Sequence, residues 1–93
     1  MTIILEIDGF LQADGANRPF FARISAPRIT KRTEEYFCIV HAPSLFTGDK
    51  RIFGIDAEQA KELAVQFLKK MLEEKCLIGK DGAPIDVTRL GVV

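Results

Sequence analysis

The sequence predicts an α+β fold: a four-stranded antiparallel meander, then one long C-terminal amphipathic helix packed on one face (ββββα), and a short irregular tail. Four segments rich in β-forming residues follow one another through short links, whereas parallel pairs would need crossovers of a dozen or more residues. Apolar residues then recur at helical spacing behind a capping residue. With 93 residues the chain has room for one core, so residues 1–93 are expected to form a single domain.

The first two expected strands are Thr2–Leu11 and Arg18–Pro27, in which apolar side chains occupy alternate positions. The intervening Asp14-Gly15 pair is the strongest hairpin signal in the chain. Because the link Gln12–Asn17 is longer than two residues, we expect a looser loop there.

The third and fourth expected strands are Glu34–Ala42, which is dense in β-forming residues, and the shorter Lys50–Ile55. A polar and basic connection, Ile29–Thr33, precedes the third strand, and the loop Pro43–Asp49 joins the two. One amphipathic helix can then cover one face of the resulting sheet.

The helix is the clearest element. Asp56 is a good N-cap, and Gln59 three positions later completes a pair that resembles a capping box. We expect a helix of about 20 residues, with Gly79 as a stop. In the tail, Ile85–Thr88 has the composition of a short strand. The apolar helix face consists of Ala60, Leu63, Ala64, Phe67, Leu68, Met71 and Leu72.

Composition excludes several functional classes. Thirteen Lys and Arg residues balance thirteen Asp and Glu residues, so the chain lacks the broad basic field of non-specific nucleic-acid binders. Apolar residues make up 47% and charged residues 28%, which is typical of an ordinary globular domain and not of a disordered chain.

The N-terminal segment has no basic region, and Glu6 and Asp8 interrupt its apolar run, so no signal peptide is expected. No window approaches the ~20 apolar residues of a membrane span. Cys38 and Cys76 do not resemble a disulfide framework, and we expect two free thiols. These features predict a soluble, cytoplasmic protein with no membrane partner.

Part of the chain resembles a known group of sequences. Ala26-Pro27-Arg28 precedes a strand that holds Cys38, and the string Gly54-Ile55-Asp56-Ala57-Glu58-Gln59-Ala60 opens the helix. This pattern, with Leu90-Gly91-Val92 near the C-terminus, is similar to a family of small bacterial domains of unknown function. The resemblance implies the fold and a bacterial origin, and it supplies no chemistry.

No catalytic, metal or cofactor site is expected. His41 is the only histidine, so one chain cannot provide two histidine ligands. Cys38 and His41 are three positions apart, which places them on opposite faces of a strand. Asp56 has a structural role as the helix cap, and the seven glycines are scattered and form no phosphate loop.

Two surface features point to a partner. One is local and basic and could meet phosphate or an acidic protein surface, although Glu34 and Glu35 beside it also fit a solvated loop. Its candidate residues are Arg28, Lys31, Arg32, Lys50 and Arg51.

The other feature is a spare apolar sheet face. Ile4, Phe10, Phe21 and Phe53 occupy positions opposite to the expected core face. If that face is exposed, it favours self-association, and we expect a homodimer. The alternative is that one strand is out of phase by one residue, which would exchange its faces.

Three classes of function follow from these features. We favour a non-catalytic protein–protein interaction module, for which a neutralising partner of a toxin is one possibility by analogy of fold. The alternative is a nucleic-acid-binding accessory that uses the basic Arg28–Arg32 loop. A ligand-binding or enzymatic site formed between subunits is the weakest of the three.

Overall fold

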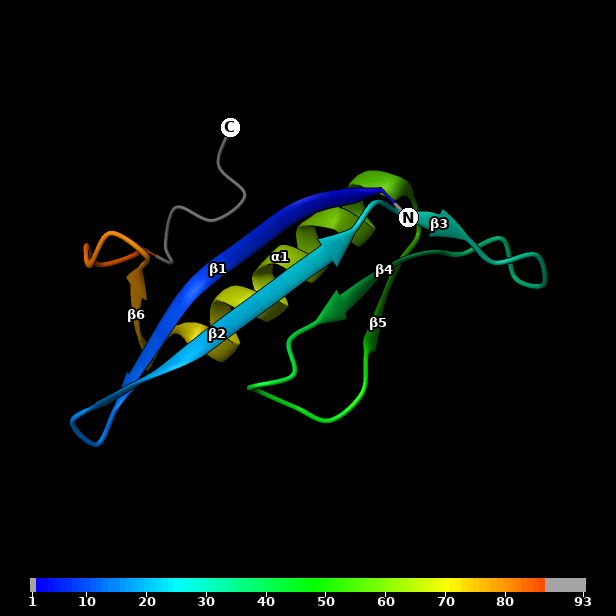
Figure 1. Ribbon diagram of the computed structural model, residues 1–93. Helices are drawn as coiled ribbons and strands as arrows, with labels where there is room; N and C mark the ends of the chain where they lie inside the picture. Colours follow the sequence, from blue (N-terminus) through cyan, green and yellow to red (C-terminus); the bar gives the residue numbers. More distant parts are fainter. Residues whose placement is uncertain (1, 87–93) are drawn as a thin grey trace.

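The computed structural model describes residues 2–86, in which a single antiparallel sheet lies against one helix (Figure 1). The predicted α+β class is confirmed, but the sheet has six strands where four were expected. In chain order the elements are β1 (Ile3–Ala13), β2 (Ala16–Ser25), β3 (Arg28–Ile29), β4 (Tyr36–His41), β5 (Lys50–Gly54), α1 (Ala57–Leu72) and β6 (Cys76–Gly79).

Strand β4 organises one half of the sheet. Phe37 pairs with Arg28 of β3 and also with Phe53 of β5, so these two strands lie on opposite edges of β4. Val40 likewise pairs with Ile24 of β2 on one edge and with β5 on the other. Strands β2 and β3 therefore pair with the same edge of β4, at different places along it, and β5 pairs with the other edge. On the far side of β2 the sheet continues with β1 and then β6.

The expected strand Arg18–Pro27 ends at Ser25, and part of the expected basic connection forms β3. The Ser25 side chain occupies this break. Its Oγ accepts a hydrogen bond from the Ile39 N–H at 2.8 Å and donates to the Ala26 carbonyl at 3.2 Å. Pro27 has no N–H to donate, so the backbone ladder is interrupted here, and the Ser25 hydroxyl serves as the acceptor for the Ile39 N–H.

The β1–β2 hairpin closes through a tight turn, so the expectation of a looser loop was wrong. Ala13 pairs with Ala16, which leaves only Asp14 and Gly15 between the strands. Their φ angles are 50° and 77°, as a type I′ turn requires. Both strands extend two residues closer to the turn than expected, because the ladder continues through polar residues up to Asp14.

Helix α1 begins as predicted and ends earlier. Asp56 Oδ1 accepts the Gln59 N–H at 2.7 Å, and Gln59 Oε1 accepts the Ile55 N–H at 2.7 Å. The helix has 16 residues and stops at Leu72, not near Gly79. The three charged residues 73–75 have no apolar group to bury, whereas Cys76–Gly79 pairs with β1 and buries Leu77.

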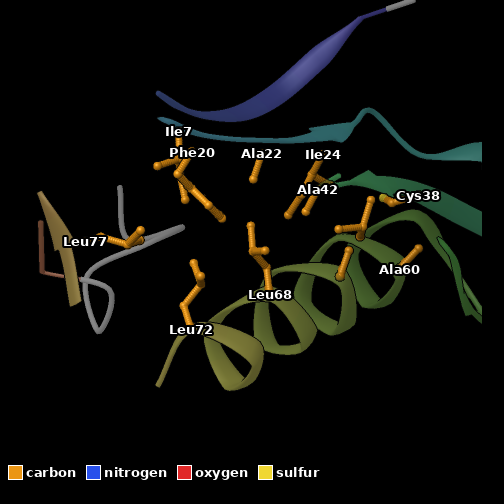
Figure 2. Packing of buried hydrophobic residues seen from close by; sticks show 12 residues of the cluster. Ile7, Phe20, Ala22, Ile24, Cys38, Ala42, Ala60, Leu68, Leu72 and Leu77 are labelled. Atoms are coloured by element: carbon orange, nitrogen blue, oxygen red, sulfur yellow. The ribbon is translucent and has the colours of Figure 1, made fainter. Parts of the chain in front are cut away.

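The core lies between α1 and one face of the sheet, with side chains from both layers pointing toward each other (Figure 2). Gly54 lets the start of the helix approach the sheet, since a Cβ there would lie 2.5 Å from the Ala60 nitrogen. The main buried residues are Ile7, Phe20, Ala22, Ile24, Cys38, Val40, Ala60, Ala64, Leu68, Leu72 and Leu77. Leu63 and Met71, expected on the buried helix face, are 38% and 36% exposed.

The start of the tail returns to β6. Pro84 forms an isolated bridge with Ile78, and the Ile85 N–H donates to the Leu77 carbonyl at 2.9 Å. The expected strand Ile85–Thr88 lies partly outside the described residues. Within residues 2–86, no helix is both long enough and apolar enough to span a membrane.

Candidate functional site

The sheet face opposite α1 is the candidate site, and we call it the open face. In Figure 1 the helix runs behind β1 and β2, on the other side of the sheet. Side chains at alternate strand positions reach this face because their neighbours in sequence fill the core. The open face consists of Glu6, Asp8 and Phe10 of β1, Phe21 and Arg23 of β2, Arg28 of β3, Phe37, Ile39 and His41 of β4, and Arg51 and Phe53 of β5.

Two aromatic rings and two arginines gather at one end of the open face. The ring centroids of Phe37 and Phe53 are 5.6 Å apart. The Arg51 guanidinium carbon lies 5.3 Å from the centre of the Phe37 ring, and Arg28 is directly opposite Phe37 in the β3–β4 ladder. Phe37 is 9% exposed, whereas Phe53 is 45% exposed. Phe53 therefore offers an apolar surface next to Phe37, on the same face as Arg28 and Arg51.

A second group lies further along the same face. The Arg23 guanidinium carbon is 4.6 Å from the centre of the Phe21 ring, and Phe21 meets the His41 ring edge-on at 6.2 Å. His41 Nδ1 is 2.7 Å from Asp49 Oδ1. Aromatic rings and guanidinium groups thus alternate across β2, β4 and β5, where cation–π contacts hold the arginines over the sheet.

The acidic residues of the open face lie on a different strand. Glu6 is opposite Arg23 in the β1–β2 ladder, and Asp8 is opposite Phe21. Asp8 Oδ2 also pairs with Lys80 Nζ at 2.9 Å, and this hydrogen bond raises the pKa of Lys80. The face is therefore divided by charge, with carboxylates on β1 and arginines on β2, β3 and β5.

The five predicted interaction residues do not form one patch. Arg28 and Arg51 lie on the open face around Phe37. Lys50 pairs with the buried Val40 and so faces the helix side, where its Nζ is 5.7 Å from the centre of the Phe46 ring. Lys31 and Arg32 are exposed in the turn between β3 and β4.

Sequence reasoning missed Arg23. Its alternation with Ala22 and Ile24 already placed it on the open face beside Phe21, but the charge argument considered clusters of neighbouring basic residues. Of the predicted spare apolar residues, Phe10, Phe21 and Phe53 do lie on this face. Ile4 lies at a bulge in β1 and is 40% exposed.

Cys38 and His41 lie on opposite faces of β4, as the spacing predicts. Cys38 is fully buried in the core, and this burial raises the pKa of its thiol, while the positive charge of Lys61 opposes the shift. Cys76 is exposed, and both cysteines are free. Among residues 2–86, no three His, Cys, Asp or Glu side chains form a cluster that could hold a metal ion.

The two thiols are expected to react at very different rates. A thiol reagent should modify the exposed Cys76 quickly and Cys38 only as the chain opens, because the reactive thiolate is disfavoured at the buried site. Stopped-flow measurements on the chain and on Cys76→Ser test this, and two equal rates would contradict the burial of Cys38.

The comparisons with known proteins add no relative. No family model, no curated protein and no solved structure matches this chain. The resemblance to a family of small bacterial domains therefore stays a prediction, and its Leu90-Gly91-Val92 element lies outside the described residues.

Proposed function

We propose that this chain is a protein–protein interaction module that binds its partner through the open face. The observation that supports this function is Phe53, a large apolar side chain that is 45% exposed on that face beside Phe37, whose ring also contacts Arg51. Aromatic residues and arginine are enriched in protein interfaces, and they dominate the residues that contribute most to binding. The aliphatic part of an arginine side chain can also cover apolar surface while its guanidinium group stays in water. Such a face therefore remains hydrated until a partner docks.

A protein partner fits this face better than a nucleic acid. Single strands bind where bases stack on accessible aromatic rings within a positive groove. Here guanidinium groups already lie over Phe21 and Phe37, and Glu6 and Asp8 share the face and would repel phosphates. A protein surface that carries both signs of charge and an apolar centre complements this arrangement.

Site-specific photo-crosslinking in the organism that produces the chain tests the proposal. A photoreactive residue would replace Phe21 or Phe53 on the open face, and Leu63 on α1 in a control variant. Leu63 suits as a control because its exposed fraction of 38% is close to the 45% of Phe53. We expect discrete protein adducts from positions 21 or 53 and none from position 63.

If the open face is the docking surface, the yield of adducts should depend on the charged side chains of that face. Adding Arg51→Glu to the Phe53 variant should remove the adducts, because it reverses a charge beside the docking surface. No adduct from either open-face position, or equal adducts from position 63, would overturn the proposal. Adducts composed of nucleic acid would favour the alternative function.

A further inference from the structure

We infer that the partner on the open face is a second copy of this chain, in a two-fold dimer that joins Glu6 on β1 of each copy to Arg23 on β2 of the other. This inference rests on the proposed function, because it requires the open face to be a protein-binding surface. It adds the identity of the partner, a second copy of the chain, and the orientation in which the two open faces pack.

The first support is a charge pattern that is complementary to itself. Glu6 and Asp8 occupy β1, whereas Arg23 occupies the neighbouring strand β2. A second copy of such a face can place the strand of opposite charge over each of these strands. The formal net charge of zero is compatible with close approach of two copies.

The second support is that, among residues 2–86, Glu6 and Arg23 form no ion pair with each other although they are direct neighbours. They are opposite each other in the β1–β2 ladder, yet no ion pair of the described residues includes either of them. The Arg23 guanidinium instead lies over Phe21, and its Nε is buried with no hydrogen-bond partner among residues 2–86. A carboxylate that approaches from outside would pair with this guanidinium.

These charges also select the orientation of the dimer. A two-fold axis across the strands would stack β1 on β1, with Glu6 and Asp8 facing their own copies, which is repulsive. An axis along the strands, close to the β1–β2 pair, places β1 of each copy over β2 of the other. Glu6 of one copy then meets Arg23 of the second copy, and the same contact occurs twice across two sheets packed ~10 Å apart.

Charge reversal on each side of this contact provides a sharp test. Glu6→Lys and Arg23→Glu should each weaken self-association by about tenfold or more, because each places like charges together twice. In an equimolar mixture the two variants should form a heterodimer, since Lys at position 6 of one copy meets Glu at position 23 of the other. Sedimentation equilibrium on the unmodified chain, each variant and the mixture measures these affinities.

Two further measurements keep the test independent of folding defects. Glu62→Lys makes the same charge change at an exposed position on α1, and it should leave self-association unchanged. For the unmodified chain, raising the salt concentration from about 0.05 M to about 0.5 M should weaken the dimer, because salt screens the attraction between Glu6 and Arg23 of the two copies.

The failures of the two proposals can be told apart. An unmodified chain that stays monomeric at every concentration, variants that dimerise normally, or a mixture that does not recover would each overturn the dimer. Crosslinks from the open face to a different protein would then leave the interaction module standing. The absence of all protein crosslinks would overturn both.

Discussion

Replacing Phe20 with alanine is expected to lower the free energy of unfolding by about 3–5 kcal/mol. Phe20 is 1% exposed and points from β2 into the space between the sheet and α1, toward Leu68 and Leu72 (Figure 2). The truncation removes a buried ring and leaves a cavity that the surrounding strands can close only in part. Because a domain of this size is stable by only about 5–15 kcal/mol, the variant should be partly unfolded at elevated temperature.

Phe21 is the matched control, since it is the same residue type one position further along β2. Its ring lies on the open face and is only partly buried, so Phe21→Ala should cost about 1 kcal/mol. Urea unfolding followed by circular dichroism measures both variants. A larger loss for Phe21→Ala would show that the two faces of β2 are reversed, and equal losses would contradict the difference in burial between the two rings.

Gly54→Ala is expected to lower the free energy of unfolding by about 1–3 kcal/mol, because α1 packs directly on this residue. The added Cβ would lie 2.5 Å from the nitrogen and 2.9 Å from the Cα of Ala60. These are backbone atoms in the first turn of the helix, so no side chain can move aside. The start of α1 would have to shift away from β5 and loosen the packing of Ala60 and Ala64.

Gly48→Ala separates this steric effect from the effect of losing a glycine. Gly48 has a φ of 74°, and a Cβ added there would meet no atom within 4 Å, so its replacement carries a backbone cost of about 1 kcal/mol and no collision. Gly54 does not adopt a positive φ, and alanine there would by itself reduce the entropy of the unfolded chain. Unchanged or increased stability of Gly54→Ala in urea unfolding would contradict the close contact between β5 and α1.

The local patterns of the sequence correctly predicted the features that depend on a single strand or helix. The alternation that separates Phe20 from Phe21 placed one ring in the core and the other on the open face. The Asp56 and Gln59 pair marked the start of α1, and the capping hydrogen bonds form within a few residues of each other.

The candidate site was predicted in part. Arg28 and Arg51 were named for their charge, and both lie beside Phe37. Lys50 was grouped with Arg51 because they are adjacent in sequence, but adjacent residues on a strand point to opposite faces. Arg23 belongs to the site because three strands bring it beside Glu6 and His41, a relation that depends on the strand order.

By itself, the sequence determined the α+β class, the two faces of the long strands, the turn-forming pair Asp14-Gly15 and the start of the helix, since each depends on residues a few positions apart. Only the tertiary structure decided that the helix ends at Leu72, that Cys76–Gly79 becomes a strand, and that Ser25 bonds Ile39 across the sheet. The helix was expected to continue toward Gly79, but pairing of Cys76–Gly79 with the far end of β1 satisfies the backbone groups of this segment and buries Leu77. Such competition between a local helix and a distant strand partner depends on where β1 lies, and only the folded chain brings the two together.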